Sequence, residues 1–288
     1  MNLWNIDTEK SFFIEALGRF ASPEKLFYNL KSGKFAYVPK NCDAEGQTLQ
    51  SRNSLIGTFT ETWVKNLFEP FAKKLGLYAI NSVECSEIGL PKRSEADLAF
   101  CTTNSKLQSA QNIKLIFEIK MSIVSNYKYI ISNKEIDFVG DYKTHQGNPS
   151  LLRSDSMLKA IGKSINIRVS GAESTKIPIV ILGNSPITDS YQHKVDFLKT
   201  SGVIQGFWSL NPTPTQSDYI KKTEKMGFQT IENIQNIETL VNDLLNAKLN
   251  YFSSMISHKK LGEYINIAYK EATDEAKAEK FLSLIRGV

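Results

Sequence analysis

The 288-residue chain has the composition of an ordinary globular protein, with 41% hydrophobic and 23% charged residues. These values exclude a disordered chain, a fibrous repeat and a bundle of transmembrane helices. The first seven residues lack the basic start and apolar centre of a signal peptide. Three cysteines without a CxxC pair argue against a disulfide framework and a thiolate zinc site. We therefore expect a compact protein without membrane spans, located in the reducing cytoplasm.

The basic excess of the chain is concentrated in the middle of the sequence. The net charge is +5, and the segment 106–168 carries ten basic and five acidic residues, while the remainder carries 25 of each. Such an excess occurs on a solvated lysine-rich surface, and it also occurs where a protein binds a polyanion such as a nucleic acid. The charge alone does not distinguish a solvated surface from a surface that binds a polyanion.

The N-terminal part is predicted to be helical with one long loop. The apolar pattern predicts a short helix over 8–20 and a second one after the Ser-Pro pair at 22–23. The polar stretch 33–53 is predicted to be a loop. A long helix is expected over 54–76, capped by its first serine, because aromatic and aliphatic residues recur at every fourth position. Pro70 predicts a kink near its end.

The segments that follow alternate between strand and helix. Strands are expected over 77–85, 95–101, 113–122, 126–131, 177–182 and 203–210, and helices over 151–168, 189–201 and 274–286. The tail beyond residue 216 is expected to be helical, with an amphipathic stripe from Ile237 to Phe252. This order predicts an α/β fold with a mixed central sheet flanked by helices. The expected parts are an N-terminal arm (1–53), a core (54–215) and a C-terminal helical region (216–288) within one compact unit.

Two of the predicted strands place acidic residues where they can meet. In the strand over 113–122 the odd positions are apolar, and the even face carries Glu118 and Lys120 side by side. The strand over 95–101 alternates in the same way, with Asp97 on one face. If the two strands are antiparallel neighbours, Asp97 stands beside Glu118.

Such a pair of carboxylates suits a divalent cation. Two close carboxylates repel each other, and a cation relieves this repulsion by accepting both as oxygen ligands. Mg2+ keeps several waters and therefore needs few protein ligands. A lysine beside the site can orient a water, lower its pKa or stabilise developing negative charge. These residue types together are typical of an enzyme that attacks a phosphodiester.

Asp97 followed by Glu118-Ile119-Lys120 resembles the motif of the PD-(D/E)xK nuclease superfamily, and within it the type II restriction endonucleases. The order of elements over 54–210 is also similar, although Ala96 replaces the proline of the motif. The resemblance implies a restriction-endonuclease-like core. It also implies that Asp97, Glu118 and the carbonyl of Ile119 bind Mg2+, for which Mn2+ can substitute, while Lys120 positions the attacking water.

A further acidic residue is expected from the helix that precedes the sheet. Members of this superfamily often supply one there, and Glu61 is the candidate because it lies on the flank of the apolar face of the helix over 54–76. The alternative is an ordinary exposed helix glutamate. Glu84, Glu87 and Glu95 are further metal-ligand candidates if the strand register differs.

DNA-contacting residues are expected just downstream of the motif. Two of them, Lys159 and Lys163, lie four residues apart on one helix face, where they can hold phosphates. The polar loop 143–150 carries the donors and acceptors that read base edges. The full set of candidates is Lys143, His145, Gln146, Asn148, Arg153, Lys159 and Lys163. Each is also compatible with a plain solvated surface.

The resemblance implies a Mg2+-dependent type II restriction endonuclease that hydrolyses specific duplex DNA sequences and leaves 5′-phosphate ends. A homodimer is expected because two symmetric sites cut both strands most simply. A cognate DNA methyltransferase is implied as well. Two alternatives remain open: a structure-directed repair nuclease or resolvase of the same superfamily, and a non-catalytic DNA-binding protein. No Walker, GxGxxG, GxSxG or HxxxH motif supports other chemistry.

Overall fold

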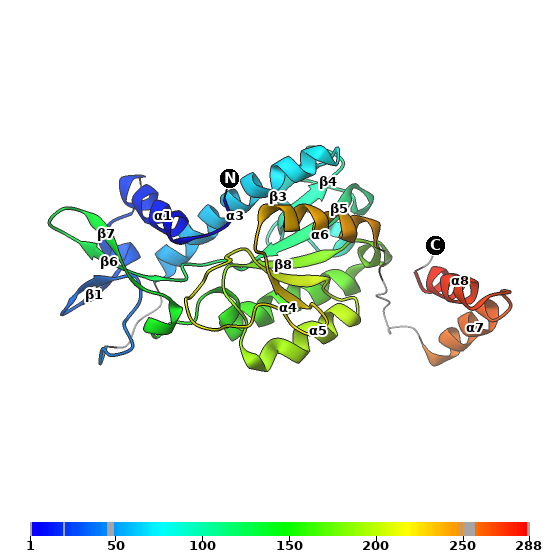
Figure 1. The fold of residues 1–288 in the computed structure, drawn as a ribbon. Helices are drawn as coiled ribbons and strands as arrows, with labels where there is room; N and C mark the ends of the chain where they lie inside the picture. Colours follow the sequence, from blue (N-terminus) through cyan, green and yellow to red (C-terminus); the bar gives the residue numbers. More distant parts are fainter. Residues whose placement is uncertain (1, 20, 45–48, 248, 250–256, 287–288) are drawn as a thin grey trace.

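The computed structural model describes residues 2–19, 21–44, 49–247, 249 and 257–286. Within this part of the chain, a six-stranded mixed sheet and a four-stranded antiparallel sheet are flanked by helices. Figure 1 shows the smaller sheet at one end of the molecule and helices on both faces of the larger sheet. The predicted α/β fold with a mixed central sheet is therefore confirmed.

The larger sheet has the order β10-β9-β8-β5-β4-β3. Its strands are β3 (Tyr78–Val83), β4 (Ala96–Cys101), β5 (Ile113–Ile119), β8 (Ile179–Gly183), β9 (Gly206–Ser209) and β10 (Phe228–Thr230). The strands from β10 to β5 run parallel, and β4 is antiparallel to both β5 and β3. The strands expected over 77–85, 95–101, 113–122, 177–182 and 203–210 are thus present, although each is shorter than expected and β8 ends one residue later, at Gly183. The strand β10 was not predicted, because the tail was expected to be helical.

Both faces of this sheet are buried. Leu98 and Phe117 pack on one face with α3 (Gln50–Lys74) and α6 (Ile234–Asn246), while Ile116 packs on the other face. That second face is covered by α4 (Ser154–Ser170) and α5 (Gln192–Thr200). Burial on both faces is typical of a sheet with parallel strands.

The long helix α3 begins earlier than the sequence predicted. Its N-cap residue is Leu49, so the expected cap at Ser54 is wrong, and Pro70 lies within a helix that continues to Lys74. Phe68 is fully buried and contacts Phe117 with the ring centroids 4.8 Å apart. Burying such side chains stabilises the packing of α3 on the sheet by about 1.5–3 kcal/mol each.

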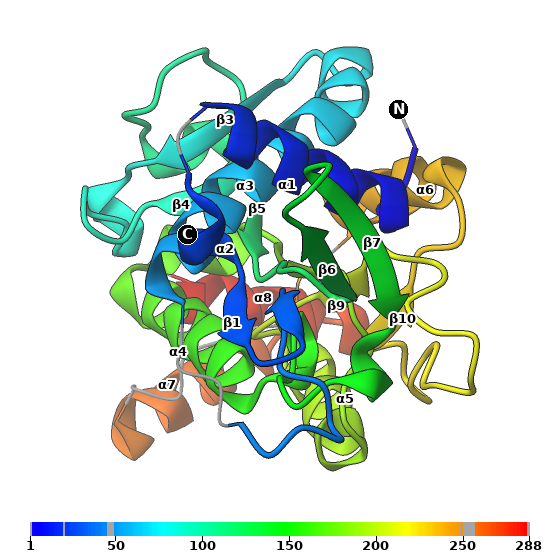
Figure 2. The same cartoon turned by 90° about the vertical axis from the view of Figure 1, so that its left-hand side faces the viewer.

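The smaller sheet has the order β1-β2-β6-β7, with every neighbouring pair antiparallel. Its strands are β1 (Tyr28–Leu30), β2 (Gly33–Phe35), β6 (Asn126–Ile130) and β7 (Glu135–Gly140). Of these only β6 was predicted, and β2 lies in the stretch that was expected to be a loop. Figure 2 shows this sheet on the side toward the viewer, with β1 below α2 (Pro23–Leu26) and the upper end of β7 beside α1 (Ile6–Arg19).

A buried glutamate of α1 ties the smaller sheet to the larger one. Glu9 is 1% exposed and accepts hydrogen bonds from Trp4 Nε1, from the hydroxyl of Tyr127, and from the main-chain N–H groups of Val124 and Ser125. The last two residues belong to the segment between β5 and β6. Glu9 therefore fixes the chain where it leaves the strand that carries the Glu-x-Lys pair.

The C-terminal part contains α6 followed by α7 (His258–Ala268) and α8 (Asp274–Arg286). The predicted amphipathic stripe is present in α6, where Ile237 and Val241 are buried, whereas Phe252 lies outside the described residues. Among the described helices, none has the length and apolar character needed to span a membrane.

Candidate active site

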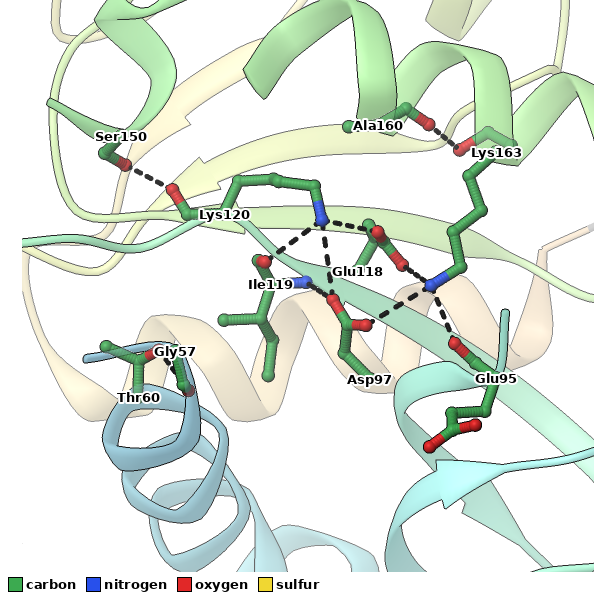
Figure 3. A network of polar contacts seen from close by, with 11 residues as sticks. Gly57, Thr60, Glu95, Asp97, Glu118, Ile119, Lys120, Ser150, Ala160 and Lys163 are labelled. Carbon is green, nitrogen blue, oxygen red and sulfur yellow. Dashed lines mark hydrogen bonds and ion pairs between the residues drawn. The ribbon is translucent and has the colours of Figure 1, made fainter. Parts of the chain in front are cut away.

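The register of two strands brings the predicted acidic residues together. The strands β4 and β5 are antiparallel neighbours, and Leu98 pairs with Phe117. One residue further along, Asp97 therefore stands opposite Glu118. Because Leu98 and Phe117 face α3, both carboxylates point to the face of the sheet that α4 covers (Figure 3). The predicted pairing of these strands is confirmed.

Lys120 lies against both carboxylates. Its Nζ is 2.5 Å from Glu118 Oε1, 3.6 Å from Asp97 Oδ2 and 3.3 Å from the carbonyl oxygen of Ile119. The main-chain N–H of Ile119 donates to Asp97 Oδ2 at 2.7 Å and fixes that carboxylate against β5. Three oxygens thus surround the ammonium group of Lys120.

A second lysine enters the same cluster from α4. Lys163 Nζ is 2.5 Å from Glu118 Oε2, 3.2 Å from Asp97 Oδ1 and 2.7 Å from the carbonyl oxygen of Glu95. The sequence predicted that Lys163 and Lys159 share a phosphate-binding face. The structure separates them, because Lys159 is exposed and pairs with Asp155 at 3.0 Å.

Burial and charge shift the acidity of these groups. Burial raises the pKa of Glu118, and the neighbouring Asp97 adds to the rise, while Lys120 and Lys163 oppose it. Burial alone would lower the pKa of Lys163, but the two carboxylates outweigh it and the pKa is raised. The side chain of Glu118 is only 6% exposed, so its charge depends on the two ammonium groups.

Glu61 belongs to the surroundings of this cluster. Burial raises its pKa to about 7, and repulsion from Asp97 and Glu118 adds to the effect, which Lys120 and Lys163 oppose. Glu61 is half-buried on α3, and Asn81 of β3 donates to its main-chain carbonyl. The structure thus brings the residue expected from the helix before the sheet within electrostatic reach of the carboxylate pair.

The cluster fits a divalent cation that needs few protein ligands. Among the described residues, no three His, Cys, Asp or Glu side chains form a metal-binding group. Asp97, Glu118 and the Ile119 carbonyl nevertheless place three oxygens around one cationic group. Mg2+ accepts such a set, because water supplies its remaining ligands. The alternative ligand Glu87 is engaged elsewhere, where its side chain accepts from the N–H of Ala110.

A cleft of about 800 Å³ adjoins the cluster, and Ile119 and Lys120 form part of its wall. It is lined by β1, the segment after β2, the first turns of α3, the end of β5, the loop before α4 and the start of α4. The charged residues among its described lining are Arg52, Lys120, Arg153, Lys159 and Asp155. Lys120 is paired with Asp97 and Glu118, and the other three basic groups outnumber the one acid, so the cleft attracts a polyanion.

The candidate DNA-contacting residues divide into two groups. Those that line the cleft are Gln146, Asn148, Arg153 and Lys159. Lys143 is not among the described lining residues, and its Nζ donates to the carbonyl of Asp218. His145 is 1% exposed and stacks on Tyr37 with the ring centroids 4.0 Å apart. Burial lowers its pKa to about 4, so the ring is a neutral packing element rather than a DNA contact in this conformation.

Two residues that support the site were not identified from the sequence. Arg52 is buried beneath the cleft, where it donates to the carbonyl of Ala36 and lies over the ring of Tyr37. Ser150 Oγ donates to the carbonyl of Lys120 at 2.7 Å and accepts from the N–H of Asn184. Ser150 has φ of 51°, an uncommon value for a serine, which places its hydroxyl at the end of β5. No sequence pattern signals either contact.

Comparison of the chain with protein-family models, curated proteins and solved structures found no match. Two carboxylates offer oxygen ligands, two ammonium groups neutralise them, and one of these lysines faces a basic cleft. Such a site can bind a divalent cation and a polyanion side by side.

Proposed function

We propose that the chain is a Mg2+-dependent endonuclease of the PD-(D/E)xK superfamily that hydrolyses duplex DNA, in the manner of a type II restriction enzyme. One observation carries the proposal. Asp97 and Glu118 stand opposite each other on neighbouring strands, and Lys120, which contacts both, forms part of the wall of a basic cleft. The proposed core would be the larger sheet with α3 and α4.

The cleft supports DNA as the partner. Arg153 and Lys159 are exposed at its rim, where contacts to phosphates give affinity that depends on salt but not on sequence. Asn148 presents an exposed amide group of the kind that pairs with adenine in the major groove, whereas the amide nitrogen of Gln146 donates to the carbonyl of Cys42 at 3.0 Å. The cleft thus combines phosphate-binding and base-reading chemistry next to the carboxylates.

The side chains of the cluster have separate parts in the proposed reaction. Asp97, Glu118 and the Ile119 carbonyl would hold Mg2+, which supplies a Lewis acid at the phosphate when bound. The Lys120 ammonium group can orient the attacking water and stabilise negative charge on the phosphate oxygens. A carboxyl with a pKa of about 7, as in Glu61, can accept a proton near neutral pH.

The finer parts of the proposal follow from the resemblance. Cleavage of both strands at a symmetric sequence requires two sites, so we propose a homodimer. Products with 5′-phosphate ends and a cognate methyltransferase that protects the host DNA complete the proposal.

The test is incubation of the purified protein with unmethylated phage DNA in Mg2+ or in EDTA, followed by gel electrophoresis. We expect discrete fragments in Mg2+ only, and none from the Asp97→Ala variant. The matched control is Asp243→Ala, which removes an exposed carboxylate of α6 far from β4 in sequence and should leave the fragments unchanged. A smear would indicate a structure-directed or nonspecific nuclease. Intact DNA that is retarded on a native gel would indicate a non-catalytic DNA-binding protein.

A further inference from the structure

The carboxylate pair forms two oxygen cradles, one on each side. The outer cradle consists of Asp97 Oδ2, Glu118 Oε1 and the Ile119 carbonyl, and it holds the ammonium group of Lys120. The inner cradle consists of Asp97 Oδ1, Glu118 Oε2 and the Glu95 carbonyl, and it holds the ammonium group of Lys163 (Figure 3). Each cradle therefore has two carboxylate oxygens and one main-chain oxygen around a single cation.

The outer cradle can open toward the cleft. Lys120 and Ile119 both line the cleft, so the Lys120 side chain has solvent-filled space into which it can turn. Two of its three contacts are long, at 3.6 Å to Asp97 and 3.3 Å to the Ile119 carbonyl. A divalent cation that replaces the ammonium group there would meet the three oxygens assigned to Mg2+.

The inner cradle is closed by comparison. Unlike Lys120, Lys163 is not among the described residues that line the cleft. Lys163 belongs to α4, and the nearby residues Ala160, Ser164 and Ile167 of this helix are buried. Its Nζ also donates to the Glu95 carbonyl at 2.7 Å. Withdrawal of Lys163 would leave Glu118 buried with one charge partner fewer, which is unfavourable.

From this geometry we propose that Lys163 is a built-in second cation, so that the active site takes up one divalent ion per chain instead of two. The inference rests on the proposed function as a metal-dependent nuclease, and it specifies which cations neutralise the two carboxylates of that site. One divalent ion in the outer cradle together with Lys163 gives three positive charges against the two of Asp97 and Glu118. The excess positive charge faces the cleft, where a phosphate would bind.

Metal stoichiometry tests the inference without reference to activity. Mn2+ binding is measured by calorimetry and by electron paramagnetic resonance, and only sites that Asp97→Ala abolishes are counted. We expect one Mn2+ per wild-type chain. Lys163→Met and Lys163→Gln empty the inner cradle and should raise the count to two, whereas Lys163→Arg keeps the charge and should leave it at one. The matched control is Lys159→Met on the same helix, which should also leave one ion.

The outcomes separate this inference from the proposed function. Two Mn2+ per wild-type chain, in a protein that cuts DNA, would overturn the role of Lys163 and leave the nuclease proposal standing. One Mn2+ per chain in both Lys163→Met and Lys163→Gln would also overturn the proposed role of Lys163. If Lys163→Met and Lys163→Gln do not fold, the number of Mn2+ ions bound per wild-type chain decides whether the inference stands. A wild-type chain that binds no Mn2+ and cuts no DNA would overturn both proposals.

Discussion

The ion pair between Glu118 and Lys163 should contribute measurably to the stability of the fold, and a double-mutant cycle can isolate its energy. The pair is short, at 2.5 Å, and its side chains are 6% and 17% exposed. Removing one partner of a buried ion pair costs about 3–5 kcal/mol, because the other charge stays buried without compensation. Here Lys120 and Asp97 provide part of that compensation, so we expect about 3 kcal/mol for either Lys163→Met or Glu118→Gln.

The double variant should be more stable than the sum of the two changes predicts. With both groups neutral, Lys120 still faces Asp97 at 3.6 Å, and no uncompensated charge is left. We therefore expect a coupling energy of about 2 kcal/mol, within the range that residues in contact show. The assay is urea unfolding of the wild type, both single variants and the double variant, all in EDTA.

The control is a second cycle on the same helix. Lys159 and Asp155 are 3.0 Å apart, but their side chains are 70% and 48% exposed. A solvated pair of this kind should couple by about 0.5 kcal/mol or less. A coupling energy for Glu118 and Lys163 as small as that of the control would refute the reasoning that burial makes the inner pair strong.

Three further predictions concern other parts of the molecule. The folded pKa of Glu61 is about 7, above its ordinary value of 4.5, so its contribution to stability is present below pH 4.5 and is lost as the pH rises through 7. In urea unfolding in EDTA, the free energy of unfolding of Glu61→Gln should fall less between pH 5 and pH 8 than that of the wild type. The difference should be about 1–2 kcal/mol, after allowance for partial exposure. An unchanged pH profile would count against the half-buried position of this carboxyl. Glu9→Ala leaves Trp4 Nε1 and the N–H groups of Val124 and Ser125 without an acceptor and should cost about 3 kcal/mol or more in thermal unfolding. A loss below about 1 kcal/mol would contradict the network. Lys159→Ala and Arg153→Ala should each reduce the salt dependence of DNA binding by about one phosphate contact. The measurement is fluorescence anisotropy at several salt concentrations. If the dependence of the binding constant on salt does not change, the rim of the cleft does not contact DNA.

The part of the site on the central strands could be predicted because a strand alternates its side chains. The apolar positions of β5 leave Glu118 on the other face, and the same alternation in β4 places Asp97. Antiparallel pairing of two strands close in sequence was then enough to bring the carboxylates together. Both faces of the sheet proved to be buried, because α4 covers the side that carries the charges.

The contribution of Lys163 could not be predicted from helical spacing. Residues four apart lie on one helix face, yet Lys159 is exposed and Lys163 reaches the carboxylates. Which of the two is buried depends on where α4 crosses the sheet, and that crossing is set by the packing of distant residues. The sequence pattern contains no such information.

The smaller sheet was missed for a related reason. Its strands β1 and β2 have three residues each, too few for a periodic pattern, and β2 pairs with β6 about 90 residues further along the chain. The edge strand β7 is largely exposed, and its polar and apolar residues alternate only from Glu135 to Phe138, which is too short a stretch to predict a strand. The position of Arg52 beneath the cleft depends on this sheet, so it was not identified either.

The most direct test of the proposed nuclease is to separate DNA binding from DNA cleavage in the Asp97→Ala protein. Binding is measured by anisotropy in Ca2+ and cleavage by single-turnover kinetics in Mg2+, with Lys120→Ala examined in parallel. We expect both variants to bind DNA about as well as the wild type, because the carboxylate and the lysine act on the reacting phosphate more than on the rest of the duplex. We also expect both to lose cleavage. Cleavage by Asp97→Ala at the wild-type rate would show that the carboxylate pair is not the active site.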